Sequence, residues 1–318
     1  KFIALSNELA HQNTVLIQTT MGAVAVTEQG IINEAHRRGM VVPDRVRREP
    51  GSDPAAGAYV AYPKKGLQDW IGSIDINSLY PSVIRALNMA PETIIGQLRQ
   101  TLTESTIEER MHVEKKSFAG AWEGEFGSLE YQAVMRKDRA QSITIDWETG
   151  ESNILSAAEV YELIFNNDQP WMLSANGTIF THEFAGVIPG LLERWYSERK
   201  ELQAKRKKAI DAGNAVETAF WDKRQLVKKI NLNSLYGAIL NPGCRFFDTR
   251  IGQSTTLTGR CITKHMASKT NEIICGDYDY RGQSIIYGDT DSVYFSAYKP
   301  LKNDIDIGNV PWTAESVE

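Results

Sequence analysis

The feature that most constrains the fold is a pair of short β-branched runs, 284–287 and 292–295, on either side of Gly288-Asp289-Thr290-Asp291. Two such runs separated by a turn predict a β-hairpin. Two carboxylates, Asp289 and Asp291, then lie two residues apart near the tip of the hairpin. The hairpin therefore presents acids at one exposed edge.

Another apolar run, 70–76, carries Asp75 near its end, and its composition predicts a short buried strand. Strands that carry acids at their ends can hold two divalent cations roughly 3.5–4 Å apart. Mg²⁺ needs few carboxylates, because waters and substrate phosphates complete its ligand shell. One cation would lower the pKa of an attacking hydroxyl, and the other would bridge a triphosphate.

The alternative is that these acids are ordinary turn residues, since Asp is common in turns. The same Asp-x-Asp spacing recurs at 277–279 and 304–306, which we interpret as surface loops. Spacing alone therefore does not establish a metal site.

Residues 189–238 have a helical pattern that breaks near 211–214, which predicts two long helices joined in a hairpin. Residues 198–229 contain ten Lys or Arg against five Asp or Glu, although the whole chain has a net charge of −5. This local excess indicates a basic arm, whereas a merely solvated helix pair would have more balanced charge. A negative net charge does not exclude nucleic-acid binding, because the placement of the charges decides it.

Lys229 and Asn233 are four residues apart and share one face of the second helix, with Tyr236 and Gly237 a turn later. A lysine there can meet a triphosphate, and a flat Tyr beside a Gly leaves room for a base pair. Arg199 on the preceding helix could bind the same phosphates with two parallel hydrogen bonds. The alternative for Lys229 is a snorkelling side chain on a buried helix.

The rest of the chain is less informative. We expect mixed helix and loop over 1–47, a linker at 50–57 after the basic residues Arg45, Arg47 and Arg48, and helices over 78–87 and 254–275. Residues 100–185 alternate strand-like pieces with polar turns that cannot be ordered from sequence.

The length of 318 residues suits about two domains, and no apolar run is long enough for a membrane span. Three cysteines, none in a Cys-x-x-Cys pair, suggest neither a disulfide framework nor a zinc site.

Three segments resemble, in order, motifs A, B and C of family B DNA polymerases. They are Asp75-Ile76-Asn77-Ser78-Leu79-Tyr80-Pro81-Ser82, Lys229-Ile230-Asn231-Leu232-Asn233-Ser234-Leu235-Tyr236-Gly237 and Tyr287-Gly288-Asp289-Thr290-Asp291-Ser292. The run Asn88-Met89-Ala90-Pro91-Glu92-Thr93-Ile94 resembles the polymerases of T-even-type tailed phages in particular.

The resemblance implies a role for each matching residue. Asp75 and Asp291 would be the catalytic metal-binding acids, with Ile76 lending its carbonyl and Asp289 in a less direct role. Three residues, Ser78, Leu79 and Tyr80, would contact the triphosphate, and Tyr80 would also exclude a ribose 2′-hydroxyl.

By the same resemblance, Arg199, Lys229 and Asn233 would bind the incoming nucleotide, while Tyr236 and Gly237 would line the nascent base pair. Gly57 and Ala58 would contact the template. One departure concerns Gln203, which stands where the family usually has a phosphate-binding Lys; Lys205 to Lys208 follow closely.

The implied fold is α+β, a polymerase palm with an antiparallel sheet backed by helices and a helical-hairpin fingers domain. We expect an N-terminal segment at 1–47 that follows a missing exonuclease domain, the first part of the palm at 48–185, fingers at 186–241 and the second part of the palm at 242–318. The thumb is expected to be missing as well.

The implied function is DNA-templated addition of deoxynucleoside triphosphates to a primer 3′-hydroxyl in viral DNA replication, with two Mg²⁺ ions that Mn²⁺ could replace. Expected partners are primer–template DNA, a second polypeptide or segments carrying exonuclease and thumb, and a sliding clamp, with no membrane. The implied location is the cytoplasm of an infected bacterial host. Two alternatives are a non-catalytic fragment that binds primer–template and a two-metal nuclease; the nuclease would need neither the Lys229 helix nor a Tyr80 gate.

Overall fold

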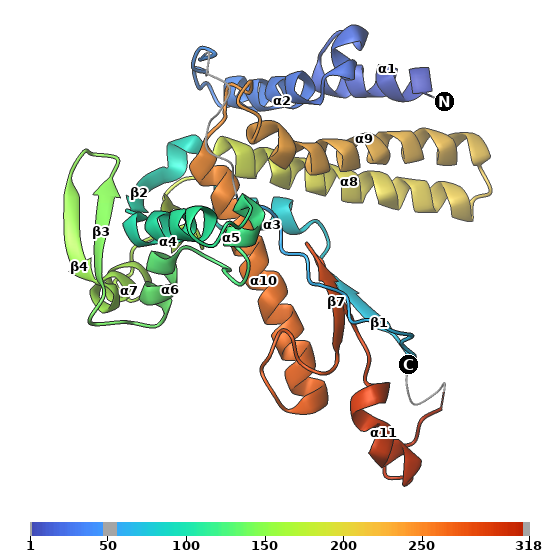
Figure 1. The fold of residues 1–318 in the computed structure, drawn as a ribbon. Coiled ribbons are helices and arrows are strands. Elements are labelled where there is room, and N and C mark those ends of the chain that lie inside the picture. The colour runs from blue at the N-terminus through green and yellow to red at the C-terminus, as the bar shows by residue number, and fades with distance from the viewer. Residues whose placement is uncertain (1, 47–55, 314–318) are drawn as a thin grey trace.

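The computed structural model describes residues 2–46 and 56–313, and three N-terminal helices form its first layer. These are α1 (Phe2–Asn13), the 3₁₀ helix η1 (Ile17–Met21) and α2 (Ala23–Arg37). Figure 1 shows α1 and α2 running alongside two later long helices. Arg47, Arg48 and most of the predicted linker lie outside the described residues.

The predicted hairpin is confirmed as β7 (Ile285–Asp289) and β8 (Ser292–Phe295), which belong to an antiparallel sheet with the order β1-β8-β7. The first strand, β1 (Gly72–Asp75), pairs with β8. Beyond β7, residues 59–64 extend the pairing, because the Ala61 N–H donates to the Gly288 carbonyl at 2.8 Å. Four chain segments therefore meet at the acid-bearing end of the sheet.

The prediction that 70–76 forms a buried strand is wrong. The strand covers only Gly72–Asp75, and Ile71 and Ile74 are 52% and 41% exposed. The reason is its position: within the described residues β1 pairs on one side only, so it is an edge strand. Its β-branched composition therefore reflects strand propensity rather than burial.

Residues 94–181 form a second antiparallel sheet with the order β4-β3-β2-β6-β5, which the sequence alone could not order. Its strands are β2 (Ile94–Leu98), β3 (Ser142–Trp147), β4 (Ser152–Ser156), β5 (Trp171–Leu173) and β6 (Thr178–Thr181). The helices α4 (Thr101–His112), α5 (Phe118–Ala121), α6 (Leu129–Met135) and α7 (Ala157–Phe165) accompany it, and η2 (Pro91–Thr93) precedes it. A reciprocal cap between Ser156 and Glu159 starts α7 immediately after β4.

The predicted helical hairpin is confirmed as α8 (Val187–Asp211) and α9 (Ala215–Ile239). The turn between them contains Gly213 at φ 67°, a backbone conformation that favours glycine. The Asn214 side chain then caps α9 by accepting from the Glu217 N–H at 3.1 Å.

The helix predicted at 254–275 is α10 (Thr249–Cys275), which begins five residues earlier because Asp248 caps it. The 277–279 acids are in an exposed loop, as predicted. The loop predicted at 304–306 is wrong, because these residues end α11 (Tyr298–Asp306).

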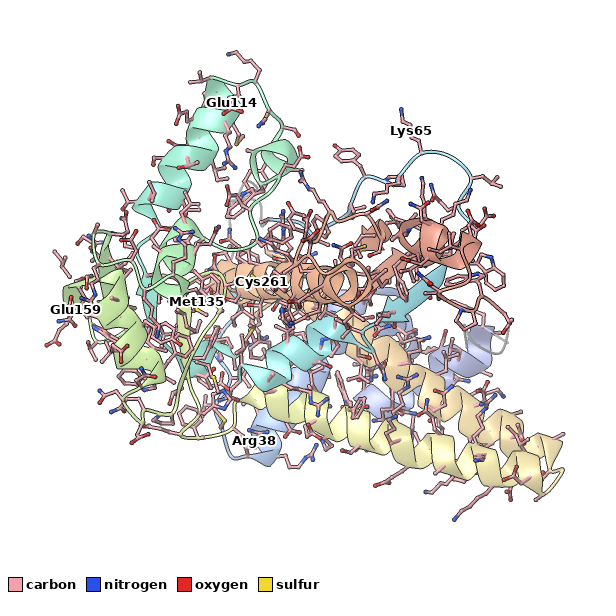
Figure 2. All side chains as sticks on the ribbon, turned by 90° about the horizontal axis from the view of Figure 1, so that it is seen from below. Arg38, Lys65, Glu114, Met135, Glu159 and Cys261 are labelled. Atoms are coloured by element: carbon pink, nitrogen blue, oxygen red, sulfur yellow. The ribbon has the colours of Figure 1, made fainter. Side chains whose placement is uncertain are left out.

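The main apolar core joins α2, α3 (Leu79–Ala86), α8, α9 and the start of α10. Figure 2 shows α10 crossing the middle of the molecule, with Cys261 labelled on it. Mixed helices and antiparallel sheets confirm the predicted α+β class. None of the helices in the described residues is long and apolar enough to cross a membrane.

Candidate active site

Asp75 and Asp291 come together because their strands are neighbours. In the register of β1 and β8, Asp75 lies opposite Ser292, and the Ile76 N–H donates to the Asp291 carbonyl at 2.8 Å. The turn itself is held from two other segments. The Thr290 N–H donates to the Tyr59 carbonyl at 2.9 Å, and the Thr290 carbonyl accepts from the Thr263 hydroxyl on α10 at 2.5 Å.

The charges of these two acids are not compensated by protein. Partial burial and the negative charge of Asp75 raise the pKa of Asp291 above its ordinary value. No Lys or Arg in the described part of the chain forms an ion pair with either carboxylate. Two crowded carboxylates without a protein cation fit a bound divalent cation.

No group of three or more His, Cys, Asp or Glu in the described ranges could hold a metal ion by itself. Asp75, Asp291 and the Ile76 carbonyl would therefore bind Mg²⁺ only with help from substrate oxygens and water, which this ion accepts readily.

Asp289 differs from the other two acids in its contacts. Its carboxylate accepts hydrogen bonds from the Tyr287 hydroxyl at 3.2 Å and the Thr290 hydroxyl at 2.9 Å. These bonds occupy both carboxylate oxygens and orient the turn. The less direct role predicted for Asp289 stays a prediction, and this geometry favours it.

Ser78 to Tyr80 lie where α3 begins, close after Asp75 in the chain. Ser78 adopts the left-handed region at φ 55°, which turns the chain sharply from β1 into the helix. The N–H groups of Leu79 and Tyr80 are in the first turn and have no acceptor within the helix, so they can bind an anion. Pro81 has no N–H to offer.

Tyr80 links the segments of motifs A and B. Its ring centroid is 4.4 Å from that of Tyr236 on α9. On another side, a Cβ atom at Gly259 would come within 3.0 Å of the Tyr80 ring, so α10 leaves room for it only because Gly259 has no side chain. Burial and the charge of Asp291 raise the pKa of Tyr80 to about 12, so its hydroxyl stays neutral at working pH.

The predicted nucleotide-binding residues of the hairpin lie on the exposed side of α9. Lys229, Asn233 and Gly237 are exposed, whereas the preceding Lys228 is buried and pairs with Glu198 at 2.6 Å. The snorkelling alternative therefore fits Lys228 and not Lys229. Arg199 is half-buried, and its Nε donates to Gln225 across the hairpin at 3.5 Å.

Two basic residues of the arm have partners within the hairpin. Arg206 pairs with Asp222 at 2.9 Å, and the Lys205 ammonium lies 4.9 Å from the centroid of the Trp221 ring. Lys207 is exposed one turn after Gln203, on the same face. Lys207 therefore places a lysine on the same face as Gln203, but one turn further from the base of the hairpin.

Gly57 and Ala58 line a cavity of about 600 Å³ between the 59–64 segment, α5 and α10. Arg260, which sequence reasoning missed, also lines it. Its side chain donates to the carbonyls of Gly57 at 3.4 Å and Trp122 at 2.9 Å. Arg260 is only 6% exposed, and no residue pattern on α10 signals this contact, because it depends on segments distant in the sequence.

Comparisons with known proteins bear on the whole chain. Residues 13–309 match the model of DNA polymerase family B. The chain is 26% identical over 307 residues to the DNA-directed DNA polymerase of Escherichia phage RB69, covering 94% of this chain and 32% of that protein. It is also 26% identical to the DNA-directed DNA polymerase of Enterobacteria phage T4, covering 95% and 33%.

Among solved structures, the family B DNA polymerase of the hyperthermophilic archaeon Pyrobaculum calidifontis aligns with 96% of this chain and 31% of its own, at a TM-score of 0.57 and 19% identity. That likeness concerns the fold. The chain spans about a third of the length of the phage polymerases that it matches.

Proposed function

Because this chain belongs to DNA polymerase family B, we propose that it carries the catalytic centre of a DNA-directed DNA polymerase, which adds deoxynucleotides to a primer 3′-hydroxyl. The observation that carries the proposal is the pair Asp75 and Asp291. Within the described residues no Lys or Arg pairs with either carboxylate, and burial together with the negative charges of Asp75 and Asp289 raises the pKa of Asp291. Such a pair suits a reaction in which metal ions and a triphosphate arrive together.

Two Mg²⁺ ions, which Mn²⁺ could replace, would lower the pKa of the primer hydroxyl and neutralise the triphosphate when bound. Asp75, Asp291 and the Ile76 carbonyl would hold them. The N–H groups of Leu79 and Tyr80 and the hydroxyl of Ser78 would orient the phosphates. Because these groups are fixed by β1 and α3, they would be in place before the nucleotide binds.

The exposed face of the hairpin would complete the nucleotide site. Lys229 and Asn233 would contact the triphosphate from α9, and Arg199 would do so from α8 after leaving Gln225. The Tyr236 ring and the exposed Gly237 would line the nascent base pair. In this proposal the sheets with α3 and α10 are the palm (48–185 and 242–318), and the hairpin is the fingers (186–241).

The cavity at Gly57 and Ala58 would receive the template strand, with Arg260 supporting the backbone that contacts it. A sliding clamp and the exonuclease and thumb functions would come from other polypeptide segments. The phage relatives favour viral replication in the cytoplasm of an infected bacterium as the setting.

Primer extension with Mg²⁺ on the purified 318-residue chain tests the proposal. We expect weak, distributive extension of one or a few nucleotides, because a thumb that grips duplex phosphates would be missing and such contacts dominate DNA affinity. DNA binding without any extension, also when the missing segments are added, would favour the non-catalytic alternative instead. Long processive products from this chain alone would contradict the proposed need for a thumb.

Replacing Lys229 tests the nucleotide-binding face. We expect Lys229→Gln to reduce kcat/KM for dNTP by about 30- to 150-fold, because a charge-assisted phosphate contact contributes about 2–3 kcal/mol. The control is Lys223→Gln, since Lys223 is equally exposed on α9 but nearly two turns nearer the tip. Equal effects of both variants would show that only the general positive charge of the hairpin matters.

A further inference from the structure

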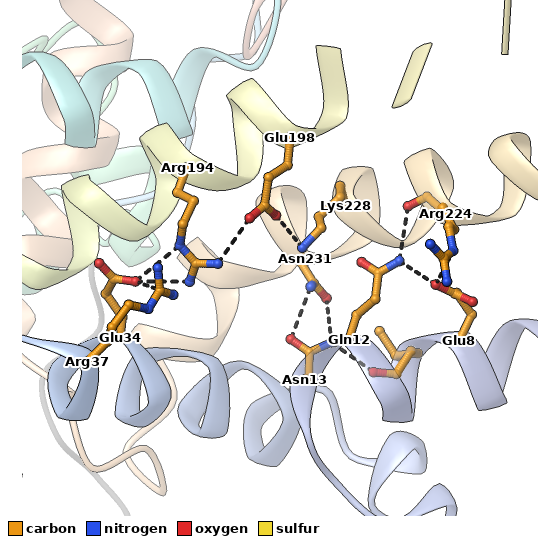
Figure 3. Close-up of polar contacts among 11 residues, drawn as sticks. Glu8, Gln12, Asn13, Glu34, Arg37, Arg194, Glu198, Arg224, Lys228 and Asn231 are labelled. Atoms are coloured by element: carbon orange, nitrogen blue, oxygen red, sulfur yellow. Dashed lines mark hydrogen bonds and ion pairs between the residues drawn. The ribbon is translucent and has the colours of Figure 1, made fainter. Parts of the chain in front are cut away.

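A buried pair of amide side chains joins the N-terminal helices to the helix that carries Lys229. Asn13 ends α1 and Asn231 lies within α9, and they are 1% and 3% exposed. The Asn231 Nδ2 donates to Asn13 Oδ1 at 3.0 Å, and the Asn13 Nδ2 donates to Asn231 Oδ1 at 3.3 Å. Figure 3 shows this reciprocal contact between the two helices.

Asn231 lies midway between Lys229 and Asn233 along the helix. Two residues correspond to a rotation of about 200° around an α-helix, so Asn231 faces almost opposite to both. Lys229 and Asn233 are exposed, as this geometry requires. A contact that fixes the direction of Asn231 therefore also fixes the direction of the proposed nucleotide-binding face.

Ionic contacts on either side of the amide pair join the same layers. On α1, the Glu8 carboxylate lies 3.3 Å from Arg224 of α9, and Gln12 donates to the Arg224 carbonyl at 3.4 Å. A chain of ion pairs also begins at Glu34 on α2. Glu34 pairs with Arg194 of α8 at 2.9 Å, Arg194 pairs with Glu198 at 3.2 Å, and Glu198 pairs with Lys228 of α9 at 2.6 Å. The amide pair is the most deeply buried of these contacts, and Asn231 is only two residues from Lys229 in the sequence (Figure 3).

We propose that Asn13 is a positioning residue for the nucleotide site: its amide pair with Asn231 sets the rotation of α9 so that Lys229 and Asn233 face the incoming triphosphate. A reciprocal amide pair forms at one rotation and one axial position, whereas an apolar contact tolerates sliding. The role of that rotation in nucleotide binding rests on the proposed function, whereas the amide contact itself does not.

Single and double replacements by Leu separate positioning from packing, because Leu has the branched shape of Asn without its polar atoms. Asn13→Leu leaves the buried Asn231 amide without its partner, and Asn231→Leu leaves the Asn13 Nδ2 with its bond to the Leu9 carbonyl at 3.0 Å but takes away the donor to Asn13 Oδ1. Each should lower the equilibrium constant for folding by about 5- to 100-fold. The double variant has no unpaired amide and should recover most of that loss. We expect KM for dNTP to rise about tenfold in both single variants and to stay raised in the double variant, with kcat changed less than about threefold.

The matched control is Asn271→Leu. Asn271 is also 1% exposed and accepts from the Ser284 N–H at 3.1 Å, but it lies on α10 and holds the 277–284 loop. We expect it to lower stability without raising KM for dNTP. A double variant with the KM of the unchanged protein would show that the pair serves packing alone and would overturn the proposal.

Hydrogen exchange gives a readout that does not need polymerase activity. Asn13→Leu should speed exchange of the backbone amides of 229–237 more than Asn271→Leu does at equal loss of stability. Equal exchange in the two variants would refute the positioning role whether or not the chain is a polymerase. Faster exchange in 229–237 together with no extension by the unchanged protein would instead count against the proposed function only.

Discussion

Asp291→Asn is expected to slow nucleotide addition by about 10³-fold or more, which corresponds to about 4 kcal/mol of lost transition-state stabilisation. The replacement keeps the size of the side chain but removes the charge that would hold a divalent cation beside Asp75. An amide oxygen binds Mg²⁺ more weakly than a carboxylate does. Single-turnover extension, with the proposed exonuclease and thumb segments supplied, measures the rate.

The same variant should be more stable than the unchanged protein at neutral pH in the absence of divalent cations. Folding raises the pKa of Asp291 above its ordinary value, because burial and Asp75 disfavour its charged form. The folded state therefore loses stability as pH rises from the unfolded pKa through the raised folded pKa. Asn cannot ionise, so it avoids this loss. The free energy of unfolding of the variant should therefore be higher by about 0.5 kcal/mol, after allowance for solvent screening of a part-exposed pair.

Urea unfolding at pH 3.5 and pH 7, with and without Mg²⁺, measures this difference. Mg²⁺ should stabilise the unchanged protein and have much less effect on Asp291→Asn, because only the former retains the charged pair. The control is Asp289→Ala, which removes the acceptor for Tyr287 and Thr290 and should be destabilising by about 1 kcal/mol. Unaltered catalysis by Asp291→Asn would remove Asp291 from the active site.

Tyr80→Ala should reduce discrimination against ribonucleotides by about 100-fold, the order of selectivity that a pocket wall can impose on one added hydroxyl. The ring is wedged between Tyr236 on α9 and Gly259 on α10, so it cannot move aside to admit a 2′-hydroxyl. Removing the ring opens that space. The measurement is the ratio of kcat/KM for dNTP and for rNTP on one template.

The matched control is Tyr80→Phe, which keeps the ring and removes only the hydroxyl. We expect it to retain the selectivity, because burial and Asp291 keep the hydroxyl neutral and the wall is formed by the ring. Loss of selectivity in both variants would assign the role to the hydroxyl instead. Unchanged selectivity in Tyr80→Ala would rule out Tyr80 as the sugar gate.

Local patterns in the sequence were sufficient for the hairpin at 285–295 and for the paired helices α8 and α9. Both depend on interactions within a few residues, such as the Asn214 cap and the left-handed Gly213 between the helices. The burial of β1 was predicted wrongly, because a β-branched run is compatible with an edge strand and a central one. The order of the five-stranded sheet was also out of reach, because it depends on pairing between segments up to about 85 residues apart.

The candidate site divides in the same way. The sequence by itself determined which residues we propose for the chemistry, Asp75, Asp291, Tyr80 and Lys229 among them, because motif order and residue type are local properties. Only the tertiary structure decided that Asp289 accepts hydrogen bonds from the Tyr287 and Thr290 hydroxyls and that Lys229, not Lys228, faces outward. It also brought Arg260 to the Gly57 carbonyl and Asn13 to Asn231, which are contacts between segments distant in the sequence. Those properties depend on burial and on partners brought together by folding, and no short stretch of sequence encodes them.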